Sequence, residues 1–218
     1  MQMNKIVDIN NLPKKIAIFP LSNVVFFPKT VLPLNIFEKR YIQLVNDAMK
    51  SHRLFGMIQP KQEMNFKPSV YKVGCLGKII NFEETNDNRF IINLSGIIRF
   101  NIKKEHESNK LYRELEVDYS EYKNDLIKKS IDKKDLIVKN LLNKIKTFFD
   151  KKNYVVNFKE LEKLDLDQLI NTICMISSFS AEEKQMLIET INIEKKIKLF
   201  DQIIDINLLD NFSSKTVQ

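Results

Sequence analysis

The sequence has no tryptophan and only four glycines, two cysteines and two histidines in 218 residues. Cys75 and Cys174 stand 99 positions apart and form no C-x-x-C pair, so neither a disulfide framework nor a zinc site is predicted. We expect two reduced thiols that pack as small apolar side chains. His52 and His106 are too few for a metal triad or a histidine-based nucleophile, and His106 is predicted to lie in a solvated loop.

Long apolar runs are missing as well. The longest uncharged stretch of the N-terminal region, from Ile16 to Pro28, is shorter than the roughly 20 residues of a membrane-spanning helix. Pro20 and Pro28 argue against a helix of any kind in this stretch. Residues 1–15 lack the apolar core and the cleavage site of a signal peptide. The sequence therefore predicts a cytoplasmic protein with no membrane segment.

Arginine is scarce although the chain is basic, with a formal net charge of +7 from 35 Lys and Arg against 28 Asp and Glu. The arginines are Arg40, Arg53, Arg89, Arg99 and Arg113. Arginine is the side chain best suited to bidentate contacts with phosphate and guanine. The lysines are interspersed with acidic residues and form no basic block. This pattern favours a solvated surface over a nucleic-acid footprint, which needs a concentrated basic stripe.

The chain changes character near residue 120. Before it, short apolar runs between turn residues predict strands: KIAIF, VLPLNIF, RLFGMIQ, VGCLGKIINFEE, NRFIINLSGIIRFNI and the alternating Leu115, Val117 and Tyr119. Residues 85–88 read as a hairpin turn, and Gly96 indicates a bulge. Pro33 confines its strand to a sheet edge or makes it a strand start. Between these strands, an apolar stripe predicts one amphipathic helix over residues 38–50.

After residue 120 there is neither glycine nor proline, and apolar residues recur at helical spacing. One stripe includes Ile137 to Phe149; shorter ones follow over residues 158–164 and 166–176. Ser180 and Glu183 form a capping box that predicts a helix start near Ala181. A last helix is expected from about Ile193, with a frayed tail over residues 211–218.

Catalytic motifs are absent. The Gly77-Lys78 pair is followed by Ile79, so the chain has no phosphate-binding loop of the form G-x-x-x-x-G-K-[ST]. The spacing S-x-x-K occurs at Ser69/Lys72, Ser120/Lys123 and Ser130/Lys133, about as often as chance allows, and without the wider motif set of serine-lysine enzymes. Gly74 to Gly77 fits the G-x-x-G of a KH loop, but its apolar surroundings favour a strand. We expect no catalytic residue, metal site or cofactor, and hence no enzyme.

The order of several blocks resembles a known family. FPLSNVVFFPKTVLPLNIFEKRY, FGMI, VGCLGKI, GIIRFNI and YRELEV are similar to successive blocks of the Lon N-terminal, substrate-binding domain in its stand-alone bacterial form, without ATPase or peptidase domains. The segment FSAEEKQMLIETINIEKKIKLF resembles the C-terminal helical part of those proteins, so the likeness runs from about residue 14 to residue 205. Two departures are Lys29, where the family usually has glycine, and the lack of tryptophan.

The resemblance implies an α+β fold, with an N-terminal PUA-like β pseudo-barrel that includes one helix and then a C-terminal α-helical bundle. We expect a flexible N-terminus over residues 1–13, the barrel over 14–120, the bundle over 121–210 and the frayed tail over 211–218. The implied function is non-enzymatic binding of unfolded or exposed polypeptide segments, for substrate recognition or a chaperone-like role. The alternatives are a PUA-like RNA-binding module and an adaptor or scaffold for a separate ATP-dependent protease or another partner protein.

Phe26, Phe27 and Lys29 are the candidate polypeptide-binding residues. Adjacent side chains of an extended segment point to opposite faces, so only one of the two phenyl rings is expected to enter the core readily. The other would contribute to an exposed apolar patch for a partner, unless the helical half covers both. The sequence leaves the oligomeric state open.

Overall fold

The computed structural model describes residues 8–61, 69–127 and 136–213. The chain forms two compact units, Met1–Ile127 and Lys128–Gln218. Residues 121–127 belong to the first unit, because the 3-10 helix η2 (Ser120–Leu126) contacts strand β5. The candidate pair Ser130/Lys133 lies outside the described residues, as does most of the tail that we expected to be frayed.

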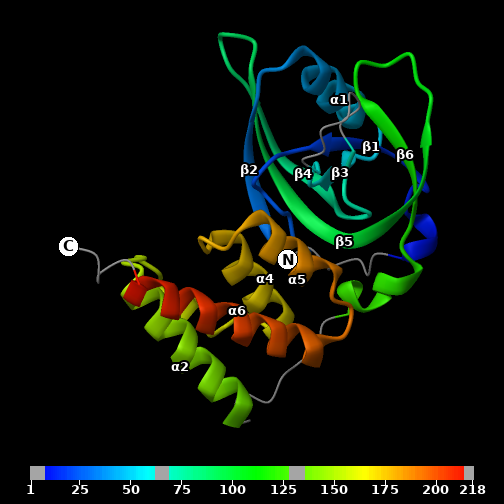
Figure 1. Ribbon diagram of the computed structural model, residues 1–218. Coiled ribbons are helices and arrows are strands. Elements are labelled where there is room, and N and C mark those ends of the chain that lie inside the picture. The colour runs from blue at the N-terminus through cyan, green and yellow to red at the C-terminus, as the bar shows by residue number, and fades with distance from the viewer. Residues whose placement is uncertain (1–7, 62–68, 128–135, 214–218) are drawn as a thin grey trace. The chain divides into compact units, whose positions relative to one another are not determined.

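The first unit is built on one six-stranded sheet (Figure 1). Its strands are β1 (Lys15–Pro20), β2 (Val31–Ile36), β3 (Leu54–Ile58), β4 (Val73–Glu84), β5 (Phe90–His106) and β6 (Arg113–Asp118). Their order is β2-β5-β4-β3-β1-β6, and β6 also pairs with β5. The sheet thus closes on itself through β5, with β2 attached outside the closed ring as an edge strand. Pro33 lies in this edge strand, as predicted.

Strand β5 reaches both β2 and β6 because it is long and bent. Its residues 90–95 pair with β2, and its residues 101–106 pair with β6. Leu76 pairs with Ile98 whereas Gly77 pairs with Gly96, so Ile97 is the extra residue of a bulge beside Gly96, as predicted. His106 is the last residue of β5 and not part of a loop, and its ring lies 3.4 Å from Glu116.

Small residues make room for large ones inside the barrel. A Cβ atom at Gly56 or Gly74 would lie 2.8 or 2.6 Å from the ring of Phe100, which is fully buried. Gly74 and Gly77 lie in β4, so the strand interpretation of the G-x-x-G pattern is confirmed. Around them the core is formed by buried side chains that include Ile18, Phe55, Leu76, Ile98 and Leu115.

Helix α1 (Lys39–Met49) is the amphipathic helix expected before β3. Its buried residues are Tyr41, Leu44, Val45 and Ala48. The Tyr41 ring stacks on Phe19 of β1 at a centroid distance of 3.8 Å, and its hydroxyl donates to the Pro20 carbonyl. Arg40 pairs with Glu38 at 2.7 Å.

Two short 3-10 helices were not predicted, η1 (Ile9–Asn11) and η2. Arg99 of β5 holds η2 through Asp125: its backbone N–H and its guanidinium both donate to that carboxylate, at 3.0 and 2.8–2.9 Å. The Arg99 guanidinium also lies 4.6 Å from the Tyr122 ring centroid. Both members of the ion pair are nearly inaccessible to solvent, so removal of one partner would leave an uncompensated buried charge.

The second unit is helical, with α2 (Leu136–Lys151), α3 (Phe158–Leu161), α4 (Leu166–Ile176), α5 (Ala181–Glu189) and α6 (Ile193–Ser213). The predicted capping box is present, with Ser180 and Glu183 each accepting the backbone N–H of the other. Phenylalanines fill the core in place of tryptophan: the Phe179 ring lies 5.5 Å from Phe148 and 5.9 Å from Phe200. Together, a mixed sheet and a helical region confirm the α+β class.

Candidate functional site

The structure buries both phenylalanines of the predicted site, with Phe26 2% and Phe27 0% exposed. Our expectation rested on an extended segment, but residues 21–30 form no strand, so side chains do not alternate there. The Phe26 ring lies against Gly77 of β4, where an added Cβ would come within 2.9 Å. An exposed phenyl ring at residue 26 or 27 therefore cannot form the apolar patch that we expected.

Lys29 adopts a left-handed conformation, with φ of 62°, in the turn that follows these residues. Its backbone N–H donates to the Gly96 carbonyl at 2.9 Å, and its ammonium donates to the Ile127 carbonyl at 3.2 Å. Gly96 is needed opposite this turn, since a Cβ there would lie 2.2 Å from the Phe27 carbonyl oxygen. The contacts of Phe26, Phe27 and Lys29 are structural, and binding of polypeptide by these residues stays a prediction.

A different surface of the first unit has the features of a binding site. Strand β4 has 12 residues and β3 has five, and the pairing of β3 with β4 stops at Leu54 and Lys78. Beyond that point β4 continues with β5 into the hairpin, and β2 pairs with the same part of β5. We call this segment the three-stranded extension: residues 79–84 of β4, 90–95 of β5 and 31–36 of β2. Figure 1 shows the β4–β5 hairpin reaching beyond the end of β3.

The three-stranded extension and the residue that follows β2 expose large apolar side chains. They are Val31, Phe37, Ile80, Phe82 and Ile91, with exposed fractions from 36% to 66%. Elsewhere among the described residues of the first unit, the exposed large apolar side chains are Leu111 and Ile127. Phe82 lies on the same face of the sheet as the buried Phe90, and their rings lie 4.9 Å apart, whereas Ile91 lies on the opposite face. Several exposed large apolar side chains within one segment are typical of a site for a partner.

The extension also has two sheet edges. On β2 the outer edge contains Pro33, which has no N–H to donate. On β4, residues 80–84 are all exposed, and no described strand pairs with the side that faces away from β5. An open edge beside exposed apolar side chains can take up an extended chain by backbone pairing. Sequence reasoning missed this site, although the unequal lengths of the runs RLFGMIQ and VGCLGKIINFEE were a signal for it.

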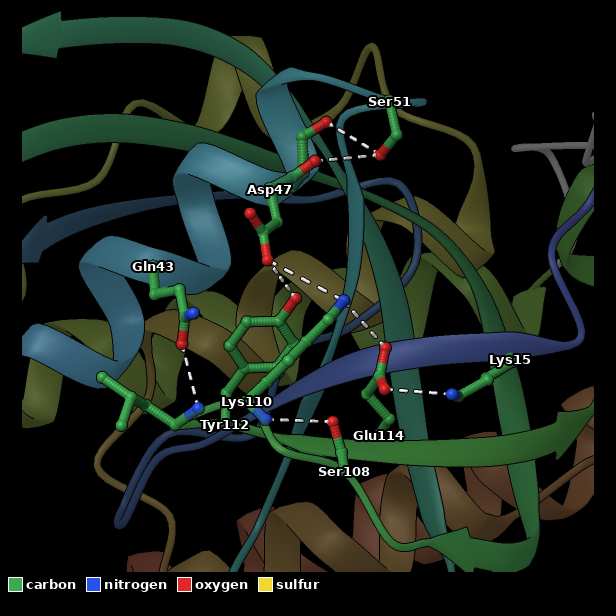
Figure 2. A network of polar contacts seen from close by, with 10 residues as sticks. Lys15, Gln43, Asp47, Ser51, Ser108, Lys110, Tyr112 and Glu114 are labelled. Atoms are coloured by element: carbon green, nitrogen blue, oxygen red, sulfur yellow. Dashed lines mark hydrogen bonds and ion pairs between the residues drawn. The ribbon is translucent and has the colours of Figure 1, made fainter.

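A separate polar site, shown in Figure 2, joins residues of α1, of β1, of β6 and of the segment before β6, and lies beside a cavity of about 160 Å³. Lys110 contacts Glu114 at 3.2 Å and Asp47 at 3.8 Å, and Glu114 also contacts Lys15 at 3.0 Å. The Tyr112 hydroxyl donates to Asp47 at 2.7 Å. A hydrogen bond with Tyr112 and the contact with Glu114 raise the pKa of Lys110, so this ammonium stays charged.

The polar site holds α1 against the segment that leads into β6, and we call it the clamp. Gln43 of α1 accepts the backbone N–H of Leu111 at 2.9 Å, so two residues of α1, Gln43 and Asp47, hold the segment before β6. Burial raises the pKa of Tyr112, which keeps its hydroxyl protonated as a donor. The lysines and carboxylates here are paired with one another, which leaves no activated base or nucleophile in the network.

The cysteines and the other residues that could act as nucleophiles or metal ligands do not form a site among the described residues. Cys75 and Cys174 are fully buried, and burial raises the pKa of both thiols, to about 12 for Cys174. Within the described parts of the chain, no group of three or more His, Cys, Asp or Glu could hold a metal ion. Among the helices of those same parts, none has the length and apolar character that crossing a membrane requires.

Comparisons with known proteins agree on one family. The family model of the ATP-dependent protease La (LON) substrate-binding domain matches residues 15–205. Lon protease of Syntrophus aciditrophicus is 24% identical over 218 aligned residues, which cover 93% of this chain and 26% of that protein. Lon protease of Desulfosudis oleivorans is 24% identical over 200 residues, or 87% of this chain and 23% of that protein. The chain thus spans about a quarter of the length of these curated relatives.

Solved structures share the fold. The N-terminal domain of Mycobacterium avium complex Lon protease has a TM-score of 0.62 at 14% identity, covering 88% of this chain and 98% of that one. A Lon N-terminal domain protein from Xanthomonas campestris has a TM-score of 0.60 at 18% identity, covering 88% and 97%. These identities support the fold alone, whereas the family model covers most of the sequence. The chain therefore belongs to the family of LON substrate-binding domains.

Proposed function

We propose that this protein binds unfolded or exposed polypeptide segments, in substrate recognition or a chaperone-like role, and that binding involves no catalytic step. The family match supports a substrate-binding role. The observation that carries the proposal is the three-stranded extension, which exposes four large apolar side chains, with Phe37 as a fifth just after β2, and has an open strand edge on β4. The cytoplasmic location expected from the sequence is part of the same proposal.

The physical basis of binding is apolar contact combined with backbone pairing. Folded proteins bury most of their large apolar side chains, so a site that collects exposed ones discriminates unfolded segments from folded surfaces. Each apolar side chain of the segment that leaves water contributes about 25 cal/mol for every Å² buried. Backbone hydrogen bonds add affinity that does not depend on the side chains of the bound segment. This suits a protein that binds many different segments.

Titration of the full chain with a fluorescently labelled, reduced and alkylated α-lactalbumin tests the proposal by anisotropy. The double variant Phe37→Asn/Ile91→Asn removes two of the exposed apolar side chains of this site. Leu111→Asn is the control, because Leu111 is 62% exposed and Phe37 is 66% exposed, but Leu111 belongs neither to the extension nor to the residue that follows β2. We expect the double variant to bind about tenfold more weakly, which corresponds to a loss of about 1.4 kcal/mol.

The control variant is expected to bind as the original protein does. Circular dichroism spectra and unfolding midpoints of both variants must match the original, so that a change in binding reports the surface alone. Undetectable binding of the unfolded protein at high micromolar concentration would refute the proposed function. Equal weakening by Leu111→Asn would refute the placement of the site on the extension.

A further inference from the structure

The hydrogen-bond register shows which backbone groups of β4 are available at its open edge. The Thr85 N–H donates to the Arg89 carbonyl at 2.9 Å, so residues 85 and 89 occupy a hydrogen-bonded position of the β4–β5 ladder. Bonded and non-bonded positions alternate in an antiparallel pair. Glu83, opposite Ile91, is therefore bonded to β5, whereas the N–H and C=O groups of Phe82 and Glu84 point away from β5 toward the open edge.

The same reasoning shows that the outer edge of β2 is less suited than the open edge of β4 to pairing with an added strand. The Gly96 N–H donates to the Thr30 carbonyl, so the alternation directs the backbone of residues 31, 33 and 35 to the outer edge of β2. Residue 33 is proline, so a donor is missing in the middle of that edge. The open edge of β4 has no proline and, beyond the bulge at Ile80, offers a regular donor and acceptor pattern over residues 81–84.

The charge of this edge is acidic. Residues 79–88 contain the carboxylates Glu83, Glu84 and Asp87 and no cation. Asp87 is paired with Arg89 at 2.8 Å, but Glu83 and Glu84 are exposed and form no ion pair with any described residue. Two cationic residues, Arg53 and Lys78, lie at the other end of the open edge. There the Arg53 carbonyl accepts the Ile79 N–H at 2.9 Å. Basic residues of a bound segment would thus be directed to the hairpin end.

A second copy of this chain fits the edge poorly. Two β4 edges paired antiparallel across this segment would bring Glu83 and Glu84 of both copies close together, and like charges on neighbouring strands are destabilising. A segment of opposite charge meets no such penalty. It would place one basic residue beside Glu84, the next beside Glu83 and an apolar residue beside the Phe82 ring, which is 36% exposed.

We propose that the open edge of β4 binds an extended polypeptide segment in which two adjacent basic residues precede a large apolar residue. The order follows from antiparallel addition, because the added strand then passes Glu84, Glu83 and Phe82 in turn. The inference rests on the proposed function, since it names the class of segment that the site prefers. Adjacent basic side chains point to opposite faces of the added strand, as Glu83 and Glu84 do on β4.

Two fluorescein-labelled ten-residue peptides test this preference by anisotropy. One has the core Lys-Lys-Phe in a background of threonine and serine, and the other has Glu-Glu-Phe in the same background. We expect the full chain to bind the basic peptide about five- to tenfold more tightly at low salt, because two exposed ion pairs replace two like-charge contacts. The preference should shrink as salt rises from about 0.01 to 0.5 M, since screening weakens exposed charge pairs.

Three variants separate the contribution of charge from that of backbone pairing. Glu83→Lys/Glu84→Lys is expected to invert the order of the two peptides. Phe82→Ala shortens the apolar side chain but keeps its N–H, whereas Phe82→Pro also removes the N–H that faces the edge and spares the ladder with β5. Phe82→Pro should bind the basic peptide at least about threefold more weakly than Phe82→Ala, because it loses a backbone hydrogen bond in addition. Circular dichroism of each variant checks that it is folded.

Equal affinities for the two peptides, or no inversion by the charge variant, would overturn the inference. Equal binding by folded Phe82→Pro and Phe82→Ala would also overturn it, because backbone pairing would then be absent. If neither peptide binds while reduced and alkylated α-lactalbumin does, the preference is wrong and the proposed function stands. If the unfolded protein fails to bind as well, both are wrong.

Discussion

At the scale of single residues, Lys29 adopts a backbone conformation that its side chain disfavours. Its φ is 62°, and a residue with a Cβ pays roughly 1–2 kcal/mol for that region. The turn is held in place by its hydrogen bond to Gly96. We expect Lys29→Gly to raise the free energy of unfolding by about 0.5–1 kcal/mol, because relief of this strain exceeds the loss of the amine contact with Ile127. Urea unfolding followed by circular dichroism measures the change.

Lys29→Ala is the matched control for that substitution. It also removes the amine contact but keeps the Cβ, and therefore the strain. We expect it to be no more stable than the original protein. If Lys29→Ala were stabilised as much as Lys29→Gly, the gain would come from the side chain, and the explanation by backbone strain would fail.

Lys184, in α5, is a second residue with an unusual environment. It is 8% exposed, and its ammonium donates to the Met175 carbonyl at 3.4 Å. Burial lowers the pKa of Lys184, so the cost of its charge is fully present below that lowered pKa, decreases as the pH rises past it and disappears above the ordinary pKa of lysine, roughly 10.4. We expect Lys184→Met to raise the free energy of unfolding at pH 7 by about 1 kcal/mol, because methionine keeps the packing without the charge.

Lys195→Met is the corresponding control on α6, where Lys195 is exposed. Its effect should stay within about 0.5 kcal/mol, as is usual for surface substitutions. The gain from Lys184→Met should also diminish as the pH rises from 7 toward the ordinary pKa of lysine, roughly 10.4, because the unfolded chain then loses the same charge. A Lys184→Met protein less stable than the original at pH 7 would mean that the bond to Met175 outweighs the cost of burial.

At the scale of elements, the bulge of β5 depends on a residue without a side chain. A Cβ at Gly96 would lie 2.2 Å from the Phe27 carbonyl oxygen and 3.1 Å from the Pro28 Cα atom, both part of the backbone. Neither atom can move without disturbing the Lys29 turn. We expect Gly96→Ala to lower the free energy of unfolding by about 2–3 kcal/mol. Ser95→Ala, at the neighbouring position, should change it by less than about 1 kcal/mol, and comparable losses for both variants would contradict the close-approach argument.

The clamp between α1 and β6 predicts a pH dependence. Burial tends to raise the pKa of Glu114, but hydrogen bonds from Lys15 and Lys110 outweigh it and hold that pKa below its ordinary value. A carboxylate with a lowered pKa contributes stability above its unfolded pKa, roughly 4.3, and this is lost as the pH falls through the folded pKa. We expect Glu114→Gln to cost about 1–2 kcal/mol at pH 7.

That cost should shrink as the pH falls below about 4, because the original protein then loses the charged form of Glu114 as well. Urea unfolding at pH 7 and pH 3 measures both values. Glu107→Gln serves as the control, since Glu107 is exposed and follows β5 outside the network. A cost of Glu114→Gln that is the same at both pH values would show that packing, and not charge, holds this clamp.

At the scale of the whole molecule, the sequence predicted the elements better than the site. The run VGCLGKIINFEE corresponds residue for residue to β4, and the Ser180 capping box starts α5, because both signals are local. The burial of Phe26 and Phe27 was not predictable in the same way, since it depends on a non-extended segment and on Gly77 in another strand. The unequal lengths of two predicted strands were a signal for the open edge of β4, but which residues remain unpaired depends on the register of the assembled sheet.

The net charge of +7 leads to a last prediction, on the RNA-binding alternative. A protein that contacts 6–10 phosphates loses roughly 10³–10⁵ in affinity between 50 and 200 mM salt, so low salt is where RNA binding would be most visible. The three-stranded extension instead exposes apolar side chains and two unpaired carboxylates, which repel phosphate. We expect anisotropy to detect no binding of a mixed-sequence, 20-nucleotide RNA at about 50 mM salt, while reduced and alkylated α-lactalbumin binds in the same buffer. Tight RNA binding that Glu83→Lys/Glu84→Lys does not alter would locate a nucleic-acid site elsewhere on the molecule and contradict the preference for polypeptide.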